Sequence, residues 1–311
     1  MSQISIILPT YNVEKYIARA LESCINQTFK DIEIIIVDDC GSDKSIDIAK
    51  EYASKDDRIK IIHNEENLGT FASRNIGVLN SSSLYIMFLD PDDYLELNAC
   101  EICIKNLDYD DDLLCFNFIS INPNQLKKDK FFIKNSFSIE FFFNFFLQKY
   151  PYYNWYIWGK VYKKITFLKI FEKLPLKSKE KIIMGEDALT FLAYLFFSKH
   201  IKTLDDNLYY YDLTNDNSST NIQSKEPNLK YFESINYVIK KIHLFSLMHS
   251  NQYKFHCKIF IYNLKINKAQ SLKISEKNIF KKIQYTYQRK IIKLKRDFLI
   301  HKAKLIMFKK G

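Results

Sequence analysis

Three carboxylates that lie close together in the chain, Asp90, Asp92 and Asp93, directly follow an apolar run. The run Leu84–Leu89 is apolar or aromatic throughout, which predicts a strand buried on both faces. Carboxylates at the end of a buried strand repel one another and lose hydration, and a cation between them relieves both penalties. Asp90 and Asp92 have the spacing to approach one divalent metal ion. The alternative is that Asp92 or Asp93 caps the helix that follows.

Two further polar clusters end predicted strands. The apolar run Ile4–Leu8 leads into Pro9-Thr10-Tyr11, and the run Ile32–Val37 leads into Asp38-Asp39. The ring of Tyr11 offers a flat surface on which a nucleobase could stack, and Asp39 could accept a hydrogen bond from a base N–H. For the two aspartates the alternative is capping of the next helix.

The order of the elements places these clusters together. Between the predicted strands the apolar spacing is helical over 13–28, 44–55 and 71–79, and a further strand is predicted at 59–63. Such alternation predicts right-handed βαβ crossovers and a parallel sheet, in which ligands bind beyond the carboxyl ends of the strands. We therefore expect the three clusters to meet at one edge. Arg74, on the third helix, could pair there with phosphate, or else lie at the surface or in a salt bridge.

These parts fit a nucleoside diphosphate with its cation. A dinucleotide-binding fold is disfavoured, because the turn after the first strand has no G-x-G-x-x-G pattern and the chain has only six glycines.

The middle of the chain holds candidates for a second substrate. Both tryptophans, Trp155 and Trp158, come just before Gly159-Lys160. They could form an apolar platform for the face of a sugar, or they could serve packing alone. Further on, Glu186 and Asp187 precede an apolar helix. Such a pair could cap the helix or could supply a carboxylate that takes a proton from a hydroxyl.

Four blocks of the sequence together resemble family 2 glycosyltransferases of the GT-A fold, and they are Ile6–Asn12, Ile36–Ser42, Asn67–Asn75 and Phe88–Asp93. The resemblance implies an α/β fold with a mostly parallel central sheet flanked by helices. It also implies a UDP-linked sugar as donor, Mn²⁺ or Mg²⁺ as cofactor, and an inverting single displacement.

Within the family the chain is most similar to bacterial lipooligosaccharide β-1,3-galactosyltransferases, with the best agreement at Ile4–Tyr16, Glu22–Asp39 and Tyr85–Leu97. This similarity implies transfer of galactose to a lipooligosaccharide-type glycan. N-acetylhexosamine or glucose is the alternative sugar, and sugar nucleotidyl transfer is the alternative from another class of enzyme.

The resemblance also assigns roles by position. It implies a nucleotide-sugar site formed by Pro9, Thr10, Tyr11, Asp39, Arg74 and Asp90, a metal site formed by Asp92 and Asp90, a general base at Asp187, and acceptor contacts from Glu186, Trp155 and Trp158. The chain departs from the family near residue 210. It keeps Asn217-Ser218 but has Tyr210 and Asp212 where a His or Arg is expected.

Charge is distributed unevenly along the 311 residues. Residues 227–311 contain 20 Lys or Arg and 3 Asp or Glu, whereas the rest of the chain is slightly acidic. From about Asn228 the pattern is that of basic amphipathic helices rich in Ile, Leu and Phe. This favours an anionic membrane surface over nucleic acid as partner, and a solvated helical subdomain is the alternative. We expect a catalytic domain over 1–220 (nucleotide-sugar binding over 1–100, acceptor side over 101–220) and a basic helical extension over 221–311.

The remaining signals concern location. Six cysteines show no disulfide-framework spacing, and the C-x-x-C pair Cys100 and Cys103 reads as a buried pair on a helix. Nothing resembles a signal peptide, and no run of 18 uncharged apolar residues predicts a transmembrane helix. We therefore expect a cytoplasmic protein, peripheral on the cytoplasmic face of the inner membrane.

Overall fold

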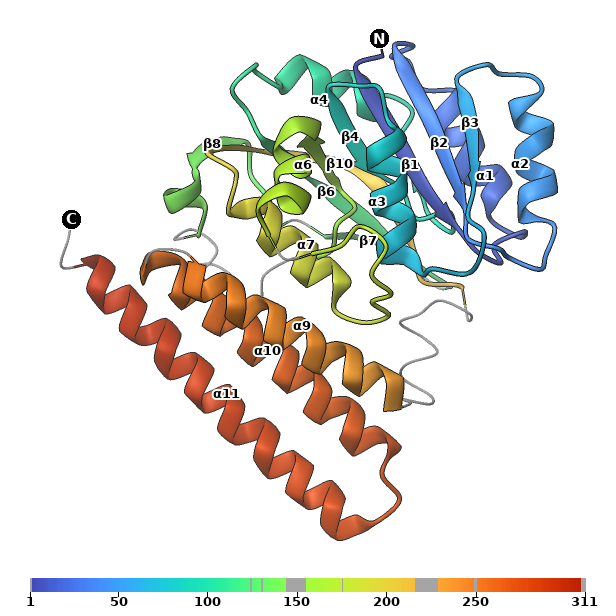
Figure 1. Cartoon of the computed structure of the whole chain (residues 1–311). Coiled ribbons are helices and arrows are strands. Elements are labelled where there is room, and N and C mark those ends of the chain that lie inside the picture. The colour runs from blue at the N-terminus through green and yellow to red at the C-terminus, as the bar shows by residue number, and fades with distance from the viewer. Residues whose placement is uncertain are drawn as a thin grey trace. The chain divides into compact units, whose positions relative to one another are not determined.

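The computed structural model describes residues 2–123, 125–129, 131–143, 155–174, 176–215, 229–248 and 251–308 (Figure 1). The chain forms two compact units. The sheet unit comprises Met1–Ile139, Tyr156–Ile182 and Phe197–Asn215, and the helical unit comprises Glu140–Trp155, Ile183–Phe196 and Asp216–Gly311. The boundary expected near residue 220 lies outside the described residues.

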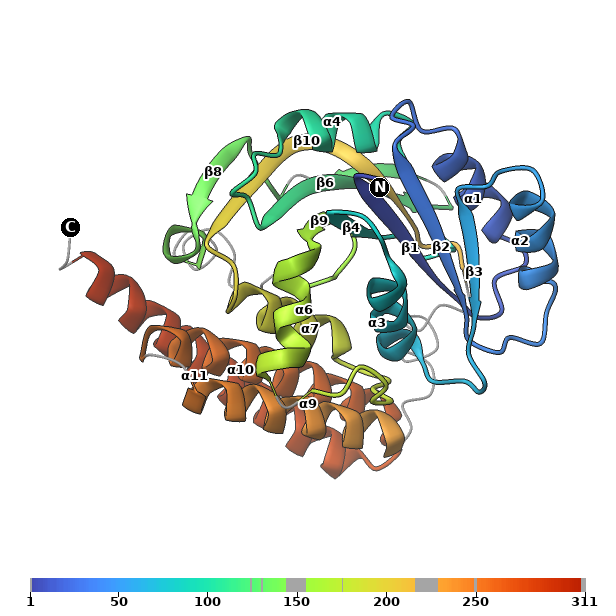
Figure 2. The same ribbon diagram turned by 45° about the horizontal axis from the view of Figure 1, so that its top comes forward.

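The sheet unit is built on one ten-stranded sheet with the order β3-β2-β1-β4-β9-β6-β10-β5, in which β7 pairs with β6 and β8 with β10 (Figure 2). The strands are β1 (Ile4–Thr10), β2 (Ile32–Asp38), β3 (Ile59–His63), β4 (Tyr85–Phe88), β5 (Tyr94–Leu95), β6 (Leu113–Asn122), β7 (Gln125–Asp129), β8 (Asn135–Ser138), β9 (Lys160–Lys163) and β10 (His200–Asp212). Strands β1 to β4 are parallel, as predicted. Strand β9 is antiparallel to both β4 and β6, so the whole sheet is mixed.

Helices cover both faces of the sheet (Figure 2). They are α1 (Ile17–Ile25), α2 (Ser45–Ala53), α3 (Thr70–Asn80), α4 (Ala99–Asn106) and α6 (Lys164–Lys173). Side chains alternate between faces along a strand, so Ile6 of β1 belongs to the core under α1, while Ile7 meets α3. A Cβ atom on Gly77 of α3 would lie 2.3 Å from Cγ2 of Ile7. The missing side chain therefore lets α3, and with it Arg74, lie close against β1.

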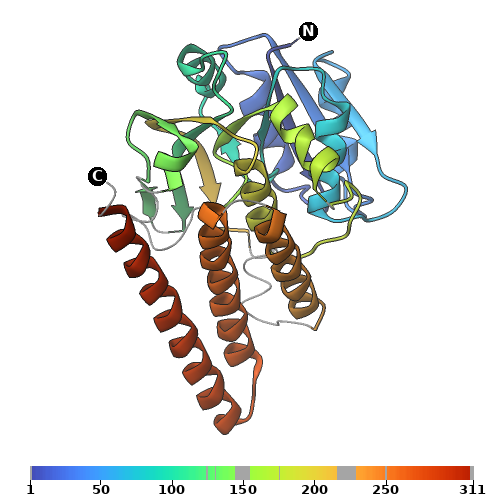
Figure 3. The same cartoon turned by 60° about the vertical axis from the view of Figure 1, so that its left-hand side comes forward.

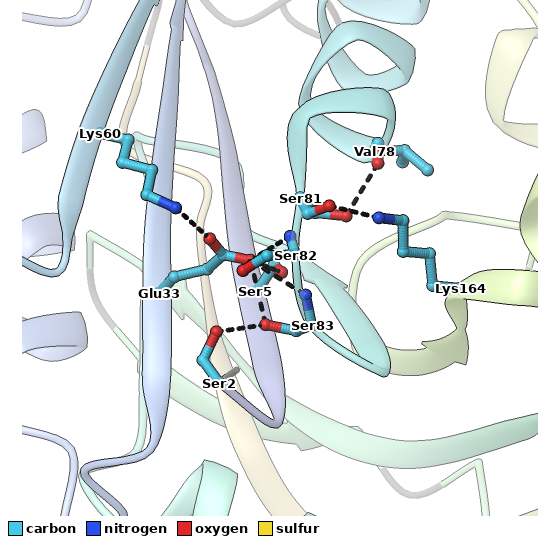
Figure 4. Close-up of polar contacts among 9 residues, drawn as sticks. All are labelled: Ser2, Ser5, Glu33, Lys60, Val78, Ser81, Ser82, Ser83 and Lys164. Atoms are coloured by element: carbon cyan, nitrogen blue, oxygen red, sulfur yellow. Dashed lines mark hydrogen bonds and ion pairs between the residues drawn. The ribbon is translucent and has the colours of Figure 1, made fainter.

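The amino ends of β1, β2 and β4 are tied together around the buried carboxylate of Glu33 (Figure 4). Glu33 accepts hydrogen bonds from Ser5 Oγ at 2.5 Å, from the Ser82 backbone N–H at 2.6 Å and from Lys60 Nζ at 2.8 Å. Burial alone would raise the pKa of Glu33, but these donors outweigh it and lower the pKa to about 2. This cluster fixes the three strands at the edge opposite to the predicted site.

The six cysteines, all described, are free thiols. Cys100 and Cys103 are buried on α4, which confirms the prediction of a buried pair. Burial raises the pKa of the Cys103 thiol well above its usual value.

The helical unit contains α7 (Glu186–Leu195), α9 (Leu229–Met248), α10 (Asn251–Ser275) and α11 (Ile279–Phe308). Helices α9, α10 and α11 lie side by side (Figure 3). The start of α7 is fixed to α9, because Ser234 Oγ accepts from the backbone N–H groups of Ile183 and Met184 at 3.2 and 3.1 Å. The helical character predicted for the basic tail is confirmed. Among the helices described, none combines the length and the apolar character needed to cross a membrane.

Candidate active site

Adjacent parallel strands bring the predicted clusters to one edge of the sheet. Thr10, the last residue of β1, pairs in register with Asp38 at the end of β2, and the backbone N–H of Asp39 donates to Thr10 O at 2.9 Å. Strand β4 flanks β1 on the other side and leads into Asp90. Pro9 and Thr10 are buried within β1, whereas Tyr11 is 50% exposed just beyond it. The ring of Tyr11 is thus accessible at the edge where stacking was predicted.

Asp39 organises the loop that leads into α3. Its Oδ1 accepts from Asn64 Nδ2 and from the Leu68 backbone N–H, both at 2.8 Å, and its Oδ2 accepts from the Gly69 N–H at 2.8 Å. Gly69 has φ +84°, a left-handed conformation that favours glycine. Each carboxylate oxygen has two lone pairs, so Oδ2 retains an acceptor position beside this structural role. Neither Asp38 nor Asp39 caps α2, whose N-cap is Lys44.

Arg74 reaches the same edge from α3. Its Nη2 lies 2.6 Å from Asp90 Oδ1, and the arginine side chain is buried while Asp90 is partly exposed. Arg74 is therefore in the salt bridge that the sequence left open as an alternative. The pair sets a guanidinium beside the first residue of the Asp90–Asp93 turn, where phosphate and metal were both predicted.

The side chain of Asp92 is held in place by Asn215, and that of Asp93 by other residues. Asp92 Oδ2 accepts from Asn215 Nδ2 at 2.8 Å. Burial, and then the nearby charge of Asp90, raise the pKa of Asp92. The turn is followed by β5 and not by a helix, and α4 begins only at Ala99, so the capping alternative is wrong.

Asp93 lies deeper than Asp92. It accepts from the Tyr209 hydroxyl at 2.6 Å and from the Asp212 backbone N–H at 2.7 Å. Burial raises its pKa well above the usual range. This carboxylate connects the turn to β10 inside the protein.

The carboxylates of Asp90 and Asp92 fit a divalent cation that takes most of its ligands from phosphate oxygens and water. Within the described parts of the chain, no group of three or more His, Cys, Asp or Glu side chains is arranged to hold a metal. Mg²⁺ and similar ions commonly use one or two carboxylates and complete their shell with phosphate oxygens and water. Burial is the main reason that the pKa of Asp92 is raised, and the charge of Asp90, which adds to it, is one that such a cation would offset.

Sequence reasoning missed the residues that support this turn from outside. Arg19 on α1 donates through Nη2 to Asp92 O at 2.6 Å and to Asp212 Oδ2 at 2.7 Å. Its guanidinium also lies 4.6 Å from the centre of the Tyr94 ring. The departure noted at Asp212 was a usable signal, because an acid at that position needs a cationic partner. Nothing local in the sequence points to Arg19 as that partner.

Glu186 and Asp187 are the first two residues of α7 in the helical unit. The N-cap is Gly185, with φ +81°, so neither acid is the cap. Both lie in the first turn, where negative charge is stabilised by the helix dipole. That position suits a carboxylate that must remain ionised in order to accept a proton.

The two tryptophans fall in different units. Trp158 is 6% exposed and stacks with Tyr156 and Tyr209 at ring-centre distances of 3.9 and 4.6 Å. Trp155 is half-buried and lies 5.8 Å from the ring of Phe260. The packing alternative therefore accounts for Trp158, while Trp155 retains some exposed surface. The predicted Asn217-Ser218 lies outside the described residues.

Comparison with known proteins gives consistent matches. The family model described as Glycosyl transferase family 2 matches residues 5–175. "Glycosyltransferase GlyA" of Streptococcus pneumoniae is 32% identical over 67% of this chain and 30% of its own length. "Uncharacterized glycosyltransferase EpsJ" of Bacillus subtilis is 31% identical over 71% of this chain and 64% of its own length. The chain thus spans less than two thirds of the length of these curated relatives.

Solved structures agree on the fold. Staphylococcus aureus TarS 1-349 in complex with UDP-GlcNAc has a TM-score of 0.64 at 18% identity, over 93% of this chain and 90% of TarS 1-349. The mannosyltransferase PcManGT from Pyrobaculum calidifontis, in complex with GDP-Man and Mn²⁺, has a TM-score of 0.57 at 12% identity, over 99% of this chain and 88% of its own. The predicted GT-A fold is confirmed.

Proposed function

The chain belongs to glycosyl transferase family 2, and from this premise we propose that it is an inverting glycosyltransferase that uses a UDP-sugar donor. The proposed reaction moves galactose, in β-1,3 linkage, to a terminal sugar of a lipooligosaccharide-type glycan. The observation that carries the proposal is the convergence of Tyr11, Asp39, the Arg74–Asp90 pair and Asp92 at one edge of the sheet.

The donor half of the reaction is assigned to the sheet unit. Tyr11 stacks on the uracil, and Asp39 accepts a hydrogen bond from it, with Pro9 and Thr10 forming the strand end beneath. Arg74 pairs with the phosphates or the ribose. Asp92, with Asp90, would hold Mn²⁺ or Mg²⁺, which when bound offsets the negative charge of the departing diphosphate.

The acceptor half is assigned to Asp187, with Glu186 and Trp155 contacting the acceptor, while Trp158 serves the packing described above. The acceptor hydroxyl oxygen forms a bond to the anomeric carbon from the face opposite to UDP, and the bond from that carbon to the phosphate oxygen breaks. The hydroxyl proton passes to a carboxylate oxygen of Asp187. Attack from the opposite face inverts the anomeric configuration.

The proposed place of reaction is the cytoplasmic face of the inner membrane. Helices α9 to α11 carry an excess of Lys and Arg, and an anionic leaflet attracts each near-surface basic residue with about 1 kcal/mol. A lipid-anchored acceptor would be presented at that surface. Nucleic acid is not a proposed partner.

The test is UDP release from a panel of UDP-sugars, with and without Mn²⁺, each paired with GalNAc-terminated and galactose-terminated acceptors. The expected result is metal-dependent release from UDP-galactose that the acceptor stimulates and that Asp187→Asn lowers by about 10²- to 10⁴-fold. Turnover of UDP-GlcNAc, the nucleotide sugar seen in TarS, would replace galactose by N-acetylhexosamine. Pyrophosphate exchange with a sugar 1-phosphate, independent of Asp187, would instead establish nucleotidyl transfer.

A further inference from the structure

A groove in the helical unit is lined by basic and apolar side chains together. It has a volume of about 380 Å³, and its residues come from α9, α10 and α11. Four of the lining side chains are basic, and they are His243, Lys258, Lys265 and Lys295. The other four are apolar or aromatic, and they are Ile261, Tyr262, Phe298 and Leu299. A groove of this composition suits a ligand with an anionic head and a hydrocarbon body.

The charge around the groove is nearly all of one sign. None of its lining residues is acidic, and α10 contributes five lysines without an Asp or Glu. Asp297, the one acid on α11, is hydrogen-bonded to Arg296 at 2.6 Å and is not among the lining residues. Burial, and then the charge of Lys265, lower the pKa of Lys268 on α10. The groove is therefore a region of positive potential that an anion would stabilise.

An exposed apolar stripe runs along α11. Its members are between 48% and 77% exposed and recur at helical spacing, and they are Phe280, Ile283, Tyr287, Ile291, Leu294 and Phe298. Phe298 belongs to both the stripe and the groove. Contiguous exposed apolar surface on one helix face indicates an interaction site.

Charge decides between the occupants of this surface. Two copies of α11 packed through their stripes would bring together two helices with nine Lys or Arg and one Asp each, and like charges oppose such pairing. Nucleic acid would satisfy the lysines and leave the stripe in water. An anionic bilayer supplies phosphates for the lysines and an apolar interface for the stripe.

We infer that the groove binds the phosphate headgroup of an anionic membrane lipid while the α11 stripe enters the bilayer interface. The inference rests on the membrane docking within the proposed function and names the site responsible. If the groove is the lipid site, membrane binding depends on the lysines that line the groove and not only on the total positive charge of the C-terminal helices.

The test is co-sedimentation of the full chain with phosphatidylcholine vesicles, with and without phosphatidylglycerol. The groove variant carries Lys258→Gln, Lys265→Gln and Lys295→Gln. A control variant with Lys290→Gln, Lys293→Gln and Lys302→Gln removes the same charge from exposed positions outside the groove. We expect the groove variant to bind phosphatidylglycerol vesicles at least about tenfold more weakly than the control variant. A stripe variant, Phe280→Gln with Leu294→Gln, should lose binding with an unchanged melting temperature.

Three outcomes overturn the inference. They are equal binding by the groove and control variants, equal binding of the unmodified chain to neutral and anionic vesicles, and a dimer in light scattering that the stripe variant abolishes while vesicle binding persists. Circular dichroism confirms the fold of each variant. UDP release by the unmodified chain with a soluble acceptor is measured in parallel, so that its failure counts against the transferase and not against the lipid site.

Discussion

Arg19 on α1 and Asp212 on β10 form an ion pair, with Nη2 2.7 Å from Oδ2. The same nitrogen donates to the backbone oxygen of Asp92 at 2.6 Å. Asp212 in turn donates its backbone N–H to Asp93. The turn that carries the proposed metal ligands is thus held from both sides by residues far from it in sequence.

Loss of Arg19 should loosen this turn without removing a metal ligand. In Arg19→Met we expect the Mn²⁺ concentration for half-maximal UDP release to rise about tenfold, because a charge-assisted hydrogen bond is lost. Lys15→Met, an exposed change just before α1, is the control. Arg19→Met should also lower the free energy of unfolding, because the buried carboxylate of Asp212 loses its cation. Adding Asp212→Asn removes that unpaired charge and should recover the lost free energy of unfolding. An unchanged metal requirement in Arg19→Met would rule out the positioning role.

Of the two proposed metal ligands, Asp90 and Asp92, we predict that Asp92 contributes more to metal binding. Asp92→Asn should weaken Mn²⁺ binding by about tenfold or more, because a neutral amide replaces a charged oxygen ligand. Isothermal titration calorimetry with Mn²⁺ in the presence of UDP measures this affinity. UDP release should fall with it. Asp47→Asn, an exposed position on α2, removes the same charge elsewhere and should change neither quantity. Equal Mn²⁺ affinity in the two variants would refute the assignment.

Asp187 is predicted to act in catalysis and not in donor binding. Asp187→Asn should lower kcat by about 10²- to 10⁴-fold, the usual contribution of a general base. Equilibrium binding of the UDP-sugar should stay the same. Glu186→Gln, at the adjacent position in the first turn of α7, should instead raise KM for the acceptor. A matching loss of donor affinity in Asp187→Asn would mean that the residue serves binding.

Glu33 should make stability depend on acid. The pKa of Glu33 is lowered to about 2 in the folded chain. The ionised carboxylate therefore contributes fully to the free energy of unfolding above about pH 4.5, and this contribution is lost as the pH falls toward 2. Glu33→Gln should reduce the free energy of unfolding at neutral pH by up to about 3 kcal/mol and flatten this acid dependence. Urea unfolding at several pH values measures both. The exposed Glu51→Gln on α2 is the control, and an equal effect there would contradict the prediction.

The strands at the start of the chain were predictable because each is a local apolar run. The run at Ile59–His63 was predicted with the bounds that β3 has, and β1 differs only by extending through Thr10. The antiparallel insertion of β9 between β4 and β6 was not predicted, since pairing between distant segments leaves no local pattern.

In the candidate site, too, contacts between distant segments could not be predicted from the sequence. Side chains that directly follow a strand were placed correctly at the sheet edge by strand order alone. The contacts of Asp39 with Leu68 and Gly69 depend on how a loop folds back, and the contact of Arg19 with Asp212 depends on a helix packing near the far end of β10. Neither follows from residue type and spacing.

The start of α7 rests on the C-terminal helices, through Ser234 and through Val238 and Leu264 beside Gly185. Recombination between related genes that exchanged the last third of the chain would therefore replace the support of the proposed base and the proposed lipid surface in a single step. The donor edge of the sheet unit would be inherited unchanged. The proposed acceptor side and the proposed membrane surface would thus change together, separately from the proposed donor site.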